Sequence, residues 1–149
     1  MNPQIKRLRA IHRLETAAQL DQYDKLIGQL ARAEPLDPAL LPDLLGSFFD
    51  DTEAREVMWG LVHHVEDYPA EVYVPRLAEA LPQMATQARE WALLLLRRVL
   101  NDDAYRALLR DAYRDAPAAR QAAMRRLLDD LVQEDATVDA VVNEVVGVR

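Results

Sequence analysis

Apolar residues recur at intervals of three and four along almost the whole sequence, and this spacing constrains the fold more than any other feature. It places apolar side chains on one face of an α-helix, whereas a half-buried strand needs strict alternation of apolar and polar residues, which is almost absent here. The chain has only four glycines for tight hairpin turns, while Ala, Leu, Arg, Glu and Gln, all strong helix formers, dominate it. The sequence therefore predicts an all-α protein.

Prolines, aspartates and breaks in the apolar spacing divide the chain into seven or eight short antiparallel helices. The first begins near Pro3, and a second apolar stripe from Leu20 to Leu30 either continues it or starts another helix. The remaining helices are expected at about 43–49, 53–68, 70–81, 86–100, 104–114, 117–132 and 136–146.

Local signals predict where several of these helices begin and end. Asp50, Asp51 and Thr52 carry side-chain oxygens that can cap the helix that follows them. Pro82 is expected to end the helix that begins at residue 70, because proline lacks an amide donor. The valine-rich tail keeps helical spacing, but valine also favours strands, so a strand stays an alternative there.

The helices are expected to form one domain over residues 1–149. Within it we expect an N-terminal helix or helix pair at 1–34, a helical core at 43–133 and a C-terminal helix at 136–146. Brief turns between the helices favour HEAT-like stacked helical hairpins. No repeat of identical residues is visible, so a compact irregular bundle is the alternative. Trp91–Leu96 is apolar on nearly every side and is placed at the centre.

Charge and composition exclude several classes of function. The formal charge of -7 opposes nucleic-acid binding and favours a basic protein partner. The chain has no cysteine, which excludes disulfides, thiolate metal sites and a cysteine nucleophile. Its longest apolar run is far too short for a membrane span, and no apolar segment follows the basic residues near the N-terminus. We therefore expect a cytoplasmic protein without membrane contact.

Catalytic and metal-binding patterns are weak. His63 and Glu66 lie three residues apart and share a helix face with Trp59, which resembles half of a helical carboxylate metal site. No second pair of this kind exists to complete such a site, so no metal or cofactor is expected. The only serine, Ser47, lacks a glycine-rich elbow, and no phosphate-binding glycine loop is present. These patterns indicate a protein that is not an enzyme.

A structural network is expected around the central helix. Trp91 and Arg98 lie seven residues apart, on about the same side of that helix, and Asn101 follows at its end. A buried tryptophan usually contributes packing, and an arginine beside it usually pairs with a carboxylate, for which Glu66 is the expected partner. We therefore predict an internal network that includes Trp91, Arg98 and Asn101.

The stretch 57–68, followed by Glu90-Trp91 and by residues 97–101, carries a family resemblance. Trp59, His63 and Glu66 lie on one helix, and Trp91, Arg98 and Asn101 follow on the next. This pattern resembles an all-helical family of polymorphic-toxin immunity proteins, Immunity protein 30, over about 45–131. The resemblance implies a non-enzymatic bacterial protein, encoded beside a secreted or contact-delivered toxin, which it neutralises by tight stoichiometric binding.

For contact with a basic toxin we expect an acidic surface with aromatic anchors. The expected partner-binding residues are Asp50, Asp51, Glu53, Glu56, Trp59, His63, Glu66, Asp67, Tyr68, Glu71 and Tyr73. Such binding either blocks the active site of the toxin or covers another surface that it needs. Whether His63 and Glu66 belong to the interface or to the scaffold stays open. The alternative function is a helical-repeat scaffold or regulator that joins other proteins and has no toxin partner.

Overall fold

The computed structural model describes residues 1–147, which contain nine α-helices, two short 3-10 helices and no strand. The helices are α1 (Pro3–Ala10), α2 (Ala17–Ala31), η1 (Pro38–Leu40), α3 (Leu41–Leu45), α4 (Arg55–Glu66), α5 (Ala70–Gln87), α6 (Arg89–Leu100), α7 (Asp103–Asp115), α8 (Ala118–Glu134), η2 (Ala136–Val138) and α9 (Asp139–Val146). The all-α prediction is confirmed. The count exceeds seven or eight because the first two apolar stripes form separate helices, divided by a turn in which Leu14 adopts a φ of 53°.

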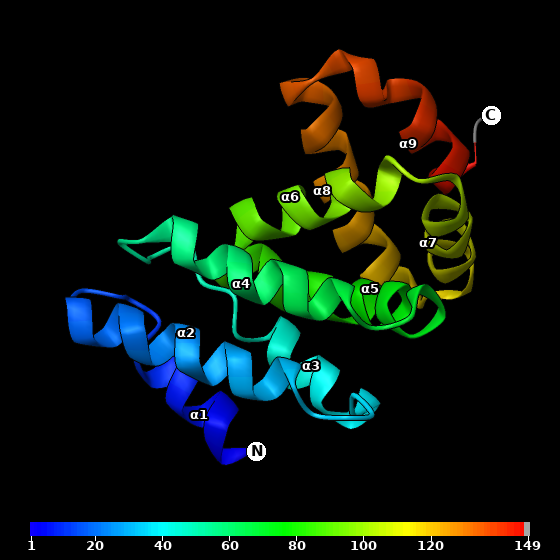
Figure 1. Ribbon diagram of the computed structural model, residues 1–149. Coiled ribbons are helices and arrows are strands. Elements are labelled where there is room, and N and C mark those ends of the chain that lie inside the picture. The colour runs from blue at the N-terminus through cyan, green and yellow to red at the C-terminus, as the bar shows by residue number, and fades with distance from the viewer. Residues whose placement is uncertain (148–149) are drawn as a thin grey trace.

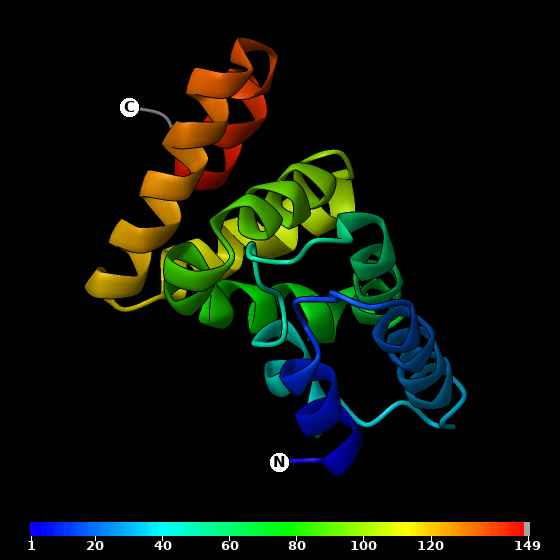
Figure 2. The same ribbon diagram turned by 90° about the vertical axis from the view of Figure 1, so that its left-hand side faces the viewer.

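The helices pack in layers around α5. Helix α5 contacts α3, α6, α7 and α8, and α2 packs on α4. In Figure 1, α1 and α2 lie at one end of the molecule, α8 and α9 at the other, and α4, α5 and α6 between them. The view in Figure 2, turned by 90°, keeps the same order. Of the two architectures expected, the compact helical bundle fits this arrangement.

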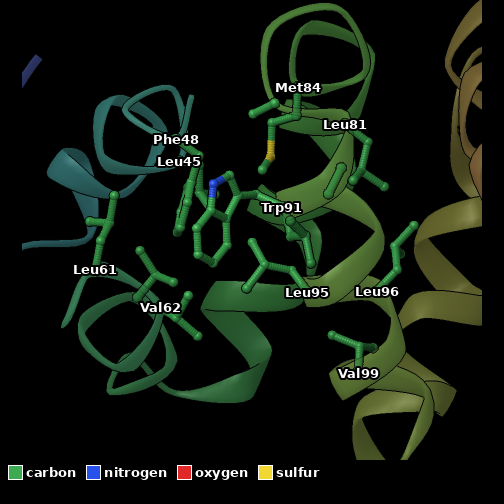
Figure 3. Close-up of a cluster of buried hydrophobic side chains, with 14 of the residues drawn as sticks. Leu45, Phe48, Leu61, Val62, Leu81, Met84, Trp91, Leu95, Leu96 and Val99 are labelled. Carbon is green, nitrogen blue, oxygen red and sulfur yellow. The ribbon is translucent and has the colours of Figure 1, made fainter. Parts of the chain in front are cut away.

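Helix α6 runs through the core, as its apolar sequence predicts. Trp91 on α6 is 1% exposed and is the first in volume among the fully buried side chains. Its indole ring lies between Phe48 and Leu95 (Figure 3). The indole Nε1 donates a hydrogen bond to the backbone oxygen of Phe49 at 3.1 Å, which satisfies the one polar atom of the ring. The tryptophan therefore joins α6 to the loop that follows α3.

The start of α4 corrects one prediction. Residues 50–52 do not cap this helix: it begins at Arg55 after Ala54, and no side chain accepts its first amides. Asp50 instead accepts a hydrogen bond from the backbone nitrogen of Glu90 at 3.0 Å. It therefore satisfies an amide in the first turn of α6, where a carboxylate also suits the positive end of the helix.

Two further helix boundaries differ from the predictions. The helix expected at 43–49 is α3, which lies earlier and ends at Leu45. The helix expected to end before Pro82 continues as α5 to Gln87. A proline inside a helix removes one hydrogen bond, but the side chains of Leu81 and Met84, on either side of Pro82, are fully buried. Burial of these side chains offsets the lost bond and keeps the chain helical.

The valine-rich tail, for which the sequence left a helix and a strand as alternatives, is helical in the structure. The valine-rich segment forms α9, with Val142 and Val145 buried, and is not a strand. Arg106 of α7 forms an ion pair with Glu144 on this helix. Within residues 1–147, no helix combines the length and the apolar character that a membrane crossing requires.

Candidate partner-binding face

Helices α4 and α6 together present one polar and aromatic face. On α4, Arg55, Trp59, His63 and Glu66 recur at intervals of four, four and three, so they lie along one side of the helix. Side chains of α6, namely those of Glu90, Trp91 and Arg98, meet this row. We call these seven residues the α4–α6 face.

An ion pair links the C-terminal ends of α4 and α6. Arg98 donates from Nε and Nη2 to the two carboxylate oxygens of Glu66, at 2.6 and 2.7 Å. The predicted pairing of these residues is confirmed. The hydrogen bond to Glu66 raises the pKa of the Arg98 guanidinium. Because the two side chains are still 39% and 21% exposed, the pair contributes only about 1 kcal/mol to stability.

Aromatic rings form the middle of the α4–α6 face. The rings of Trp59 and Trp91 meet edge to face, with centroids 6.4 Å apart, and His63 lies 5.8 Å from Trp59. The guanidinium carbon of Arg98 is 5.4 Å from the Trp59 ring centroid, within the range of cation–π attraction. Trp91 is buried, whereas Trp59 is only partly buried. Trp59 is thus a large ring held in place by its neighbours and accessible to a partner.

Arg55 belongs to this face but was not identified from the sequence. Its guanidinium carbon lies 4.5 Å from the Trp91 ring centroid, and its Nη1 donates to Glu90 at 3.2 Å. The signal that points to it is its position four residues before Trp59, which places both on one side of α4.

The structure divides the expected acidic surface into two groups at the two ends of α4. The first comprises Asp50, Asp51, Glu53 and Glu56, and the second comprises Glu66, Asp67 and Glu71. Since α4 has 12 residues, its ends are about 18 Å apart. Asp51 also contacts two side chains that follow α1, with His12 Nε2 2.9 Å from its Oδ1 and Arg13 Nη1 3.5 Å from its Oδ2. Only the second group adjoins the Arg98 ion pair.

The two tyrosines expected to anchor the surface are buried. Tyr68 is 2% exposed and donates its hydroxyl to the backbone oxygen of Asp37 at 2.9 Å, and Tyr73 is fully buried. Burial raises the pKa of both hydroxyls. Their rings pack in the core, so neither presents an exposed aromatic surface in this structure.

A pocket of about 350 Å³ opens at the end of the α4–α6 face, where α4, the start of α5 and the turn between α6 and α7 meet. Its lining consists of Glu66, Tyr73, Arg98, Val99, Asn101, Asp102 and Tyr105. Asn101, which we placed in an internal network, is exposed at the rim of this pocket. The buried hydroxyl of Tyr73 has no hydrogen-bond partner among residues 1–147.

No metal centre is formed by these side chains or by others in the described part of the chain: residues 1–147 contain no group of three or more histidine and carboxylate side chains that could hold a metal ion. His63 and Glu66 instead take part in the ring contact with Trp59 and the ion pair with Arg98.

His64 lies on the opposite side of α4 from Trp59, and its burial should make the stability of the fold depend on pH. Its side chain is buried, and this burial lowers its pKa, an effect that Asp67 partly opposes. As the pH falls through about 6.5, the unfolded chain therefore binds a proton at His64 more readily than the folded chain does. We expect the free energy of unfolding to fall as the pH drops from 7 to 5.

Urea unfolding of the wild type and of His64→Leu between pH 5 and 7.5 checks this expectation. The substitution should remove most of the slope in this range. Asp115 and Asp135 also have lowered pKa values. Their contribution to the free energy of unfolding is lost only below about pH 4, which is outside the range measured. An unchanged slope in His64→Leu would contradict the assignment.

A family model described as Immunity protein 30 matches residues 10–109, about two thirds of the chain. No curated protein and no solved structure gives a significant match. The matched segment begins and ends earlier than the 45–131 expected from the sequence pattern. It runs from the end of α1 into α7, so it includes α2, every residue of the α4–α6 face and the whole lining of the pocket.

Proposed function

Because the chain belongs to the Immunity protein 30 family, we propose that it neutralises a cognate toxin by binding it in a stoichiometric complex, without catalysis. The observation that carries the proposal is the family match over residues 10–109, which implies a toxin as protein partner.

The α4–α6 face is the proposed centre of the interface. Tryptophan and arginine side chains often supply most of the binding energy when they lie near the middle of an interface. Trp59 offers a partly exposed ring, and Arg98 and Arg55 hold the two tryptophans of the face through cation–π contacts. A rigid anchor of this kind loses little conformational entropy on binding.

Charge supports a basic partner surface. The chain carries a formal charge of -7, and the exposed carboxylates of Asp67 and Glu71 lie beside the α4–α6 face at the end of α4. Complementary charge raises the association rate and lowers binding to wrong partners more than it raises affinity. Binding should therefore slow with increasing salt concentration.

Co-expression tests this proposal. The gene for an immunity protein is expected directly downstream of its toxin gene, so the probe is the product of the reading frame immediately upstream. Expression of that product alone should arrest growth, and co-expression with this protein should restore growth and yield a complex that purifies with fixed stoichiometry. Failure of both growth rescue and co-purification would count against the proposal and favour a scaffold protein without a toxin partner.

A further inference from the structure

We propose that the pocket at the end of the α4–α6 face binds a lysine or arginine side chain of the partner protein. This inference rests on the proposed function for the identity of the partner, while the residues of the pocket determine which chemical group it binds. It assigns a charge preference to a specific position in the interface.

The charges around the pocket favour a cation. Glu66 and Asp102 contribute two carboxylates to its lining, against one guanidinium from Arg98. Because Arg98 already pairs with both oxygens of Glu66, the uncompensated negative charge of the lining is that of Asp102. Asp102 Oδ1 accepts a hydrogen bond from the backbone nitrogen of Tyr105 at 3.0 Å, so its other oxygen remains available to a ligand. With a charge of -7 on the whole chain, the field at this site attracts an ammonium or guanidinium group and repels a carboxylate.

An unpaired hydroxyl at the pocket is the second, independent observation. The hydroxyl of Tyr73 is fully buried and has no hydrogen-bond partner among the residues that the structure describes. Tyr73 lines the same pocket as Glu66, Arg98 and Tyr105. A buried hydroxyl without a partner destabilises a folded protein. In this structure the oxygen is covered. A cationic group from the partner that displaces the side chains over it can donate to this oxygen and remove that penalty in the complex.

The size of the pocket suits one side chain. A volume of about 350 Å³ is at the lower end of the range for ligand pockets, and the site is open to solvent at the rim where Asn101 and Asp102 are exposed. A single long side chain from the partner can enter it while the rest of the partner contacts the α4–α6 face.

Two tyrosine variants separate binding from stability. Tyr73→Phe removes the hydroxyl at the pocket, and Tyr23→Phe removes a second hydroxyl that is also fully buried and has no hydrogen-bond partner within residues 1–147. Tyr23 lies on α2, away from the pocket lining. Both substitutions should raise the thermal midpoint by a few degrees, because each removes a buried polar group that is not satisfied.

Only Tyr73→Phe should weaken binding to the toxin, by about tenfold, the loss expected for one hydrogen bond to a charged group. The affinity is measured by calorimetry on the purified proteins. Wild-type affinity in Tyr73→Phe would overturn the proposal. Equal losses in Tyr73→Phe and Tyr23→Phe would also overturn it, because the effect would then come from the fold.

Two aspartate variants test the charge. Asp102→Asn keeps the N-cap of α7, since asparagine caps as well as aspartate, but removes the negative charge. Asp37→Asn makes the same change at the cap of η1, away from the pocket. We expect unchanged thermal midpoints in both, and an affinity reduced about fivefold in Asp102→Asn alone, with a smaller reduction at high salt. Equal reductions in the two variants would assign the effect to net charge and contradict a local site.

A titration without the toxin distinguishes failure of this inference from failure of the proposed function. N-acetyl-lysine methylamide and N-acetyl-arginine methylamide are added to ¹⁵N-labelled protein, with N-acetyl-glutamate methylamide as the control. The cationic probes should shift the amide resonances of Asn101, Asp102 and Tyr105, and the anionic probe should not. Absent shifts, together with rescue in co-expression, would overturn the pocket and leave the proposed function intact. Shifts without rescue would support the charge preference and count against the proposed function.

Discussion

Trp91→Ala is expected to lower the free energy of unfolding by about 3–5 kcal/mol, the usual cost of removing a large buried aromatic side chain. The indole ring is 1% exposed and has its centroid 5.7 Å from that of Phe48 and 6.4 Å from that of Trp59. The substitution also leaves the backbone oxygen of Phe49 without its indole donor. Since a domain of this size has a stability of about 5–15 kcal/mol, this loss removes a large fraction of it. Urea unfolding followed by circular dichroism measures the change.

Trp91→Phe provides the matched control. Phenylalanine keeps an aromatic ring in the core but has no N–H group, so the expected loss is smaller, about 1–2 kcal/mol. Similar losses in Trp91→Ala and Trp91→Phe would show that the hydrogen bond to Phe49, and not the packing, determines the contribution of this residue. A loss below about 1 kcal/mol in Trp91→Ala would contradict its central position in the core.

The apolar spacing was sufficient to predict the helical class and the position of the central helix. Trp91–Leu96 is apolar on nearly every side, and a helix with such a sequence is expected to be surrounded by other helices. The pairing of Arg98 with Glu66, 32 residues apart, could also be predicted. An arginine beside a buried tryptophan usually pairs with a carboxylate, and Glu66 shares a helix face with Trp59 and His63.

Other features depend on contacts between distant segments, which local rules do not include. Asp50 has the sequence context of a cap for α4, yet the loop that carries it passes the start of α6 and binds Glu90. The burial of Tyr73 could have been predicted, since Leu77 and Leu81 follow it at intervals of four on the buried side of α5. The pocket could not, because its lining comes from the ends of four helices and the turns between them.

Trp59→Ala is expected to reduce the affinity for the cognate toxin at least 30-fold, which corresponds to about 2 kcal/mol at an interface hot spot. The partly exposed ring is positioned by the edge-to-face contact with Trp91 and by Arg98, whose guanidinium carbon lies 5.4 Å from the ring centroid. Substitution by alanine removes the indole ring that is held in position for contact with the toxin. The loss of stability should be smaller than in Trp91→Ala, because part of the Trp59 ring is already in contact with solvent.

Tyr113→Ala is the matched control for this binding measurement. Tyr113 is also a partly buried aromatic residue, but it lies on α7 outside residues 10–109 and outside the α4–α6 face. We expect it to retain wild-type affinity and to protect co-expressing cells, whereas Trp59→Ala should bind weakly and protect poorly while its circular dichroism spectrum stays helical. Wild-type affinity in a folded Trp59→Ala variant would place the toxin interface on another surface. Equal losses of affinity in the two variants would contradict a specific role of Trp59 in binding. They would indicate that removing a partly buried aromatic ring weakens binding through a general change in the helical packing.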